Sequence, residues 1–415
     1  MPESVRTLLG TGDAVRLIRF VHTSDLHLDR QFRGLRGTPT WVVEATRDAT
    51  LQTFRNIVDF TIEQEADALL IAGDCYDGAE RSLRAQLALT AGLERLDAAG
   101  VRTFLCHGHA DPLDDWTSRL RFPPLVQRFG PVVESVPVRP DGPVEVVGIS
   151  APGAAALPEL PRAIAGAGLA PVIIGMYHGD VAPWLGRLPD LAVDYWALGS
   201  RHRPAVVRGR DPAVVYPGAP QGTRASEDGP GGVYLVDIEE RRDPATRFAA
   251  LDTIRWAHID VETLDSTAAS ALLERLSEDV ERQLGAAQGR PLIYRITLPG
   301  EAAPDVAGIA EQLNERFLER EAFAWCHHIA RRPRAVVDRQ KRVQAEDLIA
   351  HILRLSGAAQ SDPALRRRLR DELAPLLDDD RFSSYRSSAG FTDDQLTTII
   401  GAAEAAVLDA LGMPS

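Results

Sequence analysis

Aspartate and histidine residues stand at the ends of short apolar runs in the first half of the sequence. The segments that carry them are, in chain order, Ser24–His27 (SDLH), Gly73–Asp77 (GDCYD), His107–Asp111 (HGHAD), His178 and His202. Mixed carboxylate and imidazole ligands suit Mn²⁺, Fe²⁺ or Zn²⁺ better than Ca²⁺. A carboxylate such as Asp74 can bridge two such ions, and a bridged pair can activate water against a phosphate ester.

The chain must bring these segments together although they lie far apart in the sequence. The apolar runs Arg16–His22, Ala68–Ala72 and Val101–Cys106 are typical of buried strands, and stretches with helical spacing at 40–65 and 82–99 separate them. This order predicts a largely parallel sheet with right-handed crossovers. Because ligands of open α/β sheets bind beyond the carboxyl ends of the strands, we expect the polar segments to meet at one sheet edge.

Each of these residues also has an ordinary structural explanation. Asp25 and Asp74 could be turn residues or helix N-caps, and a single histidine such as His178 or His202 is more often a hydrogen-bonded structural residue. With His27, however, these residues make five potential ligands that all follow apolar runs. Such a repeated placement is not expected by chance, so the set predicts a metal site.

From about residue 130 the apolar runs become β-rich. The predicted strands are Val132–Val138, Val144–Ile149, Val172–Met176, Tyr195–Leu198, Ala213–Tyr216 and Gly232–Ile238. They predict two sheets packed face to face with helices outside, an α/β fold. The charged segment Glu239–Pro244 is the best candidate for a boundary, so residues 16–240 are expected to form one domain.

The rest of the chain predicts a small α+β domain at 250–336 and a helical region at 337–415, and residues 1–15 are expected to be a loose extension. In the small domain, strands are expected at 254–261, 292–298 and 322–329, with helices at 266–284 and 305–320. The helical region carries two apolar stripes, which fit docking of a partner helix and ordinary core packing equally well. The stripes are Leu348, Ile349, Ile352, Leu353 and Leu355, and Leu396, Ile399, Ile400 and Val407.

Composition narrows the class of protein. The 415 residues carry a formal net charge of −13, which argues against a generally basic nucleic-acid binder. Bound metal ions and local arginines can still invert the field around a site. Three cysteines are too few for a disulfide framework, and we see neither a signal peptide nor an apolar run of about 18–20 residues. These features predict a cytoplasmic protein that does not enter a membrane.

The order D-x-H, G-D-x-x-D, a Gly-centred third motif, a histidine and a final G-x-x-H resembles that of calcineurin-like metallophosphoesterases. HTSDLHLD, AGDCYDG, DYWALG and Tyr216-Pro217-Gly218 look like the DNA-repair exonuclease branch, which includes SbcD-type nucleases. The resemblance covers residues 16–240. It implies a metallophosphoesterase β-sandwich flanked by helices, with a small capping domain and C-terminal helices. It also implies a phosphodiesterase that acts on DNA with an SMC-like coiled-coil ATPase, in a family where homodimers are common.

The resemblance also implies a set of metal ligands, with Mn²⁺ as the expected metal and room for one or two ions. One ion would be held by Asp25, His27, Asp74 and His202. The second would be held by Asp74, His178, the third-motif position that is His109 here, and a fifth-motif histidine. Candidate catalytic residues are His109, Asp111 and Arg201.

Three positions depart from the family pattern. His109 stands where the family has asparagine, and Ala110 and Ser200 stand where the family has histidines. Alanine cannot transfer a proton, and losing a positioned acid typically costs about 10²–10⁴ in rate. His107 or His109 could supply the missing imidazole through a slip of register, and Arg201 could place positive charge near the phosphate. The main alternative function is a weakened or inactive nuclease fold that serves in DNA binding or assembly. A third is a phosphoesterase of small molecules.

Overall fold

The structure is a computed structural model. It describes residues 16–35, 37–77, 82–113, 121–151, 160–210, 212–239, 243–261, 268–298, 306–331, 343–344, 347–373 and 393–410. The extension expected at residues 1–15 lies outside this part of the chain. Contacts divide the chain into two compact units, the second of which comprises Asp260–Leu272, Ile296–Gly308 and Ile329–Ser415. The domain limits expected from the sequence remain a prediction.

The first sheet contains the strands predicted from the early apolar runs. Its six strands are, in spatial order, β12 (Ala245–Ala250), β11 (Gly232–Glu239), β1 (Arg16–Thr23), β2 (Ala68–Ala72), β3 (Arg102–Cys106) and β4 (Val126–Arg128). The strands from β1 to β4 pair in parallel, and β11 and β12 extend the sheet in antiparallel pairing. Every residue of β2 is buried, as expected for a strand covered on both faces.

A second six-stranded sheet is built from the β-rich part of the sequence. Its strands are, in spatial order, β5 (Glu134–Pro137), β6 (Val144–Gly148), β7 (Val172–His178), β8 (Tyr195–Gly199), β10 (Ala213–Tyr216) and β9 (Ala205–Arg208). The four central strands are parallel, and β5 and β9 are antiparallel edges. In both sheets, the carboxyl ends of the parallel strands are therefore followed by loops that can carry functional residues.

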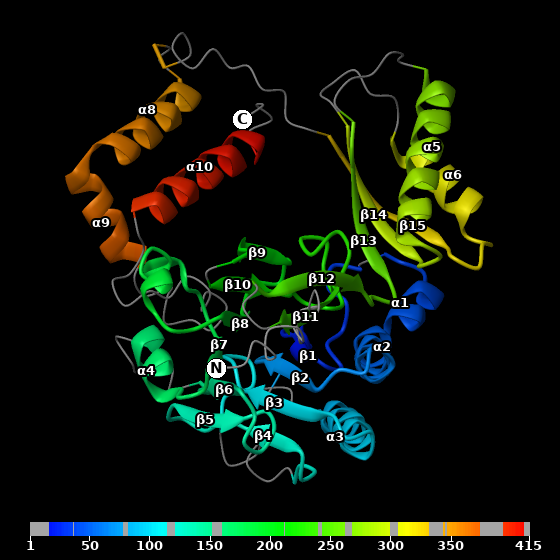
Figure 1. Cartoon of the computed structure of the whole chain (residues 1–415). Coiled ribbons are helices and arrows are strands. Elements are labelled where there is room, and N and C mark those ends of the chain that lie inside the picture. The colour runs from blue at the N-terminus through cyan, green and yellow to red at the C-terminus, as the bar shows by residue number, and fades with distance from the viewer. Residues whose placement is uncertain are drawn as a thin grey trace, which may run out of the picture. The chain divides into compact units, whose positions relative to one another are not determined.

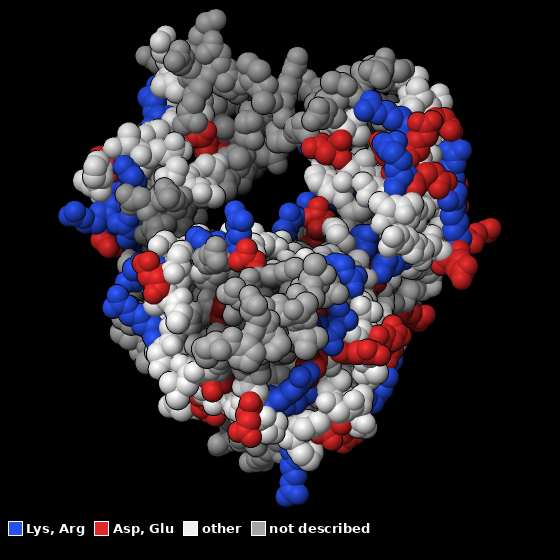
Figure 2. Space-filling view, in the orientation of Figure 1, with Lys and Arg blue, Asp and Glu red and all other residues white. Residues whose placement is uncertain are grey.

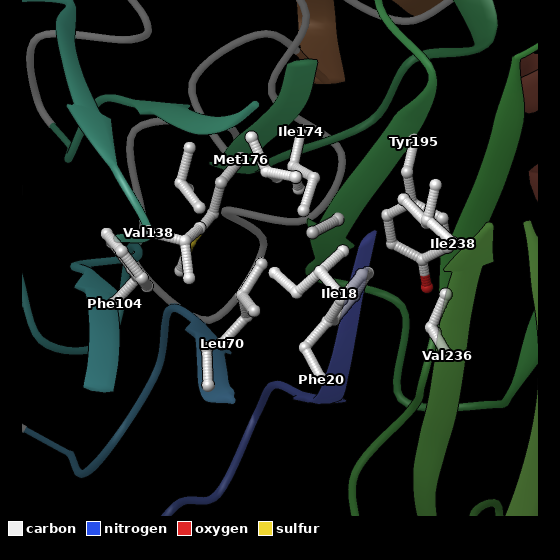
Figure 3. Packing of buried hydrophobic residues seen from close by; sticks show 14 of the residues in the cluster. Ile18, Phe20, Leu70, Phe104, Val138, Ile174, Met176, Tyr195, Val236 and Ile238 are labelled. Carbon is white, nitrogen blue, oxygen red and sulfur yellow. The ribbon is translucent and has the colours of Figure 1, made fainter. Parts of the chain in front are cut away.

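The two sheets pack face to face, which confirms the predicted α/β sandwich. Figure 3 shows Ile18, Phe20 and Leu70 of the first sheet against Ile174 and Met176 of the second. Residues that alternate with these along the strands face outward and pack against helices. The core is therefore a layer of apolar side chains beneath the strand ends, and it fixes the relative positions of the loops from both sheets.

Helices cover the outer faces of the sandwich. They are α2 (Ala49–Glu63), α3 (Leu83–Ala98), α4 (Leu160–Ala167) and the short 3₁₀ turns η4 (Ala182–Trp184) and η5 (Leu188–Asp190), whereas α1 (Thr40–Thr46) packs its Val42 against Trp256 and Ile293. Helices α2 and α3 lie along the first sheet (Figure 1). The hydroxyl of Ser82 caps α3 by accepting from the backbone N–H of Ala85 at 3.1 Å. The single helical stretch predicted at 40–65 is two helices, because the backbone leaves helical geometry at Asp48.

The charged segment Glu239–Pro244, where we expected a domain boundary, lies between two strands of the first sheet in the sequence. It connects β11 to β12, which are neighbours in the first sheet. Strand β12 was missed because its residues are half-buried or exposed and form no apolar run.

A small α+β region follows the first two sheets. Its strands are β13 (Arg255–Asp260), β14 (Leu292–Leu298) and β15 (Ala324–Arg331), and its helices are α5 (Ala269–Ala287) and α6 (Val306–Phe317). Trp256, Ile293 and Phe323 pack in one apolar cluster with Val42 and Ala49 near α1 and α2. This apolar cluster therefore packs the described part of the region against α1 and α2, the helices that follow the first motif.

Three helices end the described chain: α8 (Leu348–Ser361), α9 (Pro363–Leu373) and α10 (Asp393–Ala410). The predicted stripe on α8 divides between two faces. Leu353 is buried, whereas Leu348 and Leu355 are about 60 % and 59 % exposed. Among the helices that the structure describes, none has the length and apolar character that crossing a membrane requires.

Candidate metal centre

The loops at the strand ends bring five predicted ligands together. Asp25 and His27 follow β1, Asp74 follows β2, His178 ends β7, and His202 follows β8. Ligand atoms of Asp25, His27 and His202 lie within 4.8 Å of one another, and so do those of Asp25, Asp74 and His178. All are buried except the half-buried His202. Two overlapping sets that share Asp25 are therefore positioned to hold metal ions.

The backbone at these ligands is strained in a way that is typical of functional sites. Asp25, His27 and Asp74 have φ values of 51°, 40° and 52°, a region that costs a non-glycine residue about 1–3 kcal/mol. Two backbone bonds hold the loops in this conformation: Asp25 N–H donates to Gly73 O at 3.0 Å, and His27 N–H donates to Asp74 O at 3.0 Å. The two motifs thus fix each other.

Close approach of the loops requires glycine at Gly73 and Gly199. A Cβ on Gly73, whose φ is +87°, would lie 2.4 Å from Nδ1 of His178. A Cβ on Gly199 would lie 1.9 Å from the carbonyl oxygen of Ala72. Any side chain at either position would displace His178, so these glycines serve the geometry of the ligands.

The carboxylate of Asp25 has an oxygen that suits a cation. Its Oδ2 accepts from Ser24 Oγ at 2.5 Å and from the backbone N–H of Ser200 at 3.1 Å. Its Oδ1 is buried, has no hydrogen-bond partner among the described residues, and lies 3.7 Å from Nε2 of His202. A buried anionic oxygen without a donor is costly, and a bound metal ion would remove that cost. The residues present therefore fit a metal ion.

Asp74 lies between two imidazoles. Its Oδ2 is 3.4 Å from Nε2 of His178 and 3.7 Å from Nε2 of His27, and its Oδ1 accepts from the backbone N–H of Ala110 at 2.9 Å. Burial raises the pKa of Asp74, but the neighbouring His178 and His27 outweigh it and hold that pKa well below its usual range. Asp74 is thus an ionised carboxylate that faces two of the candidate ligand histidines.

Each ligand histidine is oriented through its Nδ1. The acceptors are Asp77 Oδ1 for His27 (2.9 Å), Glu227 Oε1 for His202 (2.6 Å) and the carbonyl oxygen of Ala72 for His178 (2.9 Å). Because each Nδ1 faces an acceptor, it carries a proton, and Nε2 is the nitrogen that faces the carboxylates. Such outer contacts fix the tautomer and raise the basicity of metal-binding histidines.

The acceptors Asp77 and Glu227 are bound in turn by arginines, and none of these contacts was expected from the sequence. Arg30 donates to Asp77 at 2.6 Å, and Arg224 donates to Glu227 at 2.6 Å. Asp77 stands inside the G-D-x-x-D motif and could have been found there. Nothing in the sequence distinguishes Glu227 from a surface glutamate.

The third motif contributes mainly to positioning. Asp111 is fully buried, and its carboxylate accepts from the backbone N–H groups of Gly108 (2.7 Å), Asp74 (3.1 Å) and Cys75 (2.9 Å). It therefore anchors the Asp74 loop from behind. His107 is buried with its Nδ1 2.8 Å from the carbonyl oxygen of Asp111, so it does not replace a missing ligand.

The remaining predicted residues lie at the exposed edge of the site. His109 is exposed, belongs to neither ligand set, and has its ring centroid 5.4 Å from that of His178. Partial loss of water around its ring, followed by the charge of His178, lowers the pKa of His109. Arg201 donates to Asp180 at 2.8 Å and lies 4.7 Å from the ring centroid of Tyr216. Ser200 is exposed.

The pairing of His178 with Asp74 makes the stability of the metal-free protein depend on pH. Burial lowers the pKa of His178, but the Asp74 and Asp25 carboxylates raise it to about 10, from an ordinary value of 6.5. A group with a raised folded pKa stabilises fully below its unfolded pKa and loses that effect as pH rises through the folded pKa. We expect the melting temperature in EDTA to fall from pH 6.5 to pH 10.

Comparison of two variants isolates this effect. His178→Gln is expected to flatten the dependence, whereas His351→Gln, a change at an exposed position of α8, is expected to keep it. Calorimetry or fluorescence melts across this range provide the measurement. An equal fall in native protein and His178→Gln would show that other groups cause it.

Three comparisons relate the chain to known proteins. Residues 18–149 match the family model of calcineurin-like phosphoesterases. The chain is 31 % identical over 330 residues to YhaO, an uncharacterised metallophosphoesterase of Bacillus subtilis strain 168, and the match covers 74 % of this chain and 80 % of that protein. A crystal structure of a dimetal phosphatase from Danio rerio aligns with a TM-score of 0.40 and 11 % identity, over 57 % of this chain and 97 % of the phosphatase.

Proposed function

Because this chain belongs to the calcineurin-like metallophosphoesterase family, we propose that its metal-dependent phosphoesterase activity is directed at phosphodiesters of DNA. The observation that carries the phosphoesterase activity is the buried cluster in which Asp25 Oδ1 has no described hydrogen-bond partner and lies 3.7 Å from Nε2 of His202. The choice of DNA is supported by the local likeness of HTSDLHLD, AGDCYDG, DYWALG and Tyr216-Pro217-Gly218 to DNA-repair exonucleases.

The proposed site assigns a role to each ligand. A first ion would be held by Asp25, His27, Asp74 and His202. A second would be held by Asp74 and His178, with His109 as the added ligand. Mn²⁺ suits this mixed set of carboxylate and imidazole ligands. When bound, the ions supply Lewis-acid activation of water and of the phosphate. Asp77 and Glu227 keep the Nε2 lone pairs of His27 and His202 directed inward.

Where His109 does not ligate an ion, it is the proposed proton donor to the leaving oxygen. It is exposed, it stands beside His178, and the neighbouring Ala110 offers no proton. We propose that Arg201 contributes positive charge beside the phosphate once the substrate competes with Asp180 for its guanidinium.

The distribution of surface charge determines which parts of the chain could attract DNA. Basic and acidic side chains alternate over the small α+β region in Figure 2, where Arg316 pairs with Glu274 and Arg320 pairs with Glu281. With a net charge of −13, the chain offers no broad field for sequence-independent binding. Recognition would therefore depend on the metal centre and on arginines close to it.

We also propose an SMC-like coiled-coil ATPase as partner, with the exposed edge of α8 as its docking surface. Leu348 and Leu355 are exposed and seven residues apart, with Ile352 between them half-buried on the same side. This spacing fits docking of one helix on another. Homodimerisation is a further proposal that rests on the family alone.

The second candidate function is a subunit that binds or assembles without cutting. Ala110 and the exposed Ser200 favour it, because both replace histidines of the family. Retention of Asp25, His27, Asp74, His178 and His202 in one cluster favours catalysis.

Cleavage of labelled single- and double-stranded DNA with Mn²⁺ tests the proposal, alongside bis-p-nitrophenyl phosphate and a nucleoside monophosphate. We expect cleavage of DNA and of the diester, abolished by EDTA. Hydrolysis of the small esters without DNA cleavage would assign a small-molecule phosphoesterase. Failure on every substrate, with DNA still bound, would favour the non-cutting subunit.

A further inference from the structure

His202 is oriented by a buried carboxylate from the connection between β10 and β11. Glu227 is 8 % exposed, and its Oε1 lies 2.6 Å from Nδ1 of His202. Its Oε2 accepts from the backbone N–H of Thr223 at 2.8 Å, and its Oε1 accepts from Nε of Arg224 at 2.6 Å. Both oxygens therefore act as acceptors, and Glu227 can only receive a proton from the His202 ring.

The position of that proton decides what His202 can bind. With hydrogen on Nδ1, the Nε2 lone pair faces Oδ1 of Asp25 at 3.7 Å and Nε2 of His27 at 3.4 Å. Nη2 of Arg224 also lies 3.3 Å from Nδ1 of His202, but a guanidinium only donates. The shorter contact to Glu227 fixes the proton on Nδ1, so Nε2 is the atom available to a metal ion.

The same connection also holds the backbone of His202. The N–H of Ala219 donates to the His202 carbonyl oxygen at 2.9 Å. A Cβ on Gly218, whose φ is +79°, would lie 2.8 Å from that oxygen. Because Ser200 replaces the other histidine of this motif, His202 is the one imidazole that the loop after β8 presents to the site.

We propose that Glu227 is a positioning residue of the metal centre, which holds His202 in the tautomer whose Nε2 binds the ion shared with Asp25 and His27. Arg224 and Thr223 in turn fix the carboxylate. Glu227 lies outside residues 18–149, the part of the chain that matches the family model. The inference rests on the proposed metal centre and adds a residue to it.

Glu227→Gln tests the role with little change in volume. An amide has one accepting oxygen and one donating nitrogen, so it cannot satisfy both Thr223 and His202 as the carboxylate does. We expect Co²⁺ affinity, from the absorbance of the full-length protein, to fall by about 10–100-fold. In ¹⁵N spectra of the metal-free proteins, we expect His202 to be a single Nδ1–H tautomer in the native chain. In Glu227→Gln we expect both tautomers.

Asp228→Asn is the matched control, since Asp228 is the next residue along and pairs with Arg203 instead of a ligand. It should keep native Co²⁺ affinity, and the metal-free melting temperature of each variant reports on the fold. Native affinity and a single tautomer in Glu227→Gln would overturn the inference, as would an equal loss in both variants. A native chain that binds no Co²⁺ would overturn the metal centre itself, and the inference with it.

Discussion

Replacing Asp74 with asparagine is expected to lower the metal-dependent hydrolysis of a phosphodiester by a factor on the order of 10³. Asp74 is the carboxylate between Nε2 of His178 and Nε2 of His27, at 3.4 and 3.7 Å. Asparagine keeps the shape but removes the charge that would hold an ion there. Metal ions supply several kcal/mol of transition-state stabilisation, and each 1.36 kcal/mol corresponds to about tenfold in rate.

The asparagine variant should remain folded, which makes the loss of rate interpretable. Its amide oxygen can still accept from the N–H of Ala110, and its amide nitrogen can donate to the Nε2 lone pairs of His178 and His27. The measurement is kcat/KM for bis-p-nitrophenyl phosphate with Mn²⁺, together with metal content. Asp190→Asn, at an exposed position of η5, is the control. Near-native turnover in Asp74→Asn would show that Asp74 is not part of the metal centre.

The sequence predicted the elements that carry the ligands because burial leaves a strong signal in a short strand. All five residues of β2 are apolar and buried, and the run in the sequence coincides with the strand. The edge strands β9 and β12 leave no such signal, since their side chains are half-buried or exposed. What a sequence pattern detects best is the buried centre of a sheet.

The ligands could be predicted for a related reason. Asp25 and Asp74 stand directly beyond central strands, and parallel strands bring their carboxyl ends to one edge. The outer contacts could not be predicted, because they depend on how distant loops fold. Glu227 reaches His202 across 25 residues of chain, and Asp77 reaches His27 across 50. No periodicity encodes such a contact.

The structure also changes how the departures from the family pattern are understood. Asp111 was a candidate catalytic residue, but its carboxylate is occupied by three backbone donors and holds the Asp74 loop. His107 is buried away from the ligand sets, which leaves His109 as the imidazole of the third motif that reaches the exposed edge. The rate of hydrolysis measures whether the His109 imidazole replaces the two histidines that the family has at the positions of Ala110 and Ser200.

Restoring both histidines, in Ala110→His with Ser200→His, is expected to raise turnover by about 10²–10⁴, the usual contribution of a positioned acid. Ser200 is exposed and already holds a non-glycine side chain at φ +99°, and Ala110 is half-buried, so both positions can accept an imidazole. Ser200→His alone should act on metal binding, and raise the number of ions bound per chain. Ala110→His alone should act on kcat at saturating metal.

The control for this pair is Ala110→Asn with Ser200→Asn, which adds polar side chains that cannot transfer a proton near neutral pH. Equal turnover in the native chain and the histidine variant, with DNA cleaved by both, would mean that His109 and Arg201 already supply what the lost histidines did elsewhere. Cleavage that is present only in the histidine variant would instead mean that the native centre binds phosphodiesters without cutting them. The size of the gain therefore distinguishes an altered active site from one retained for binding.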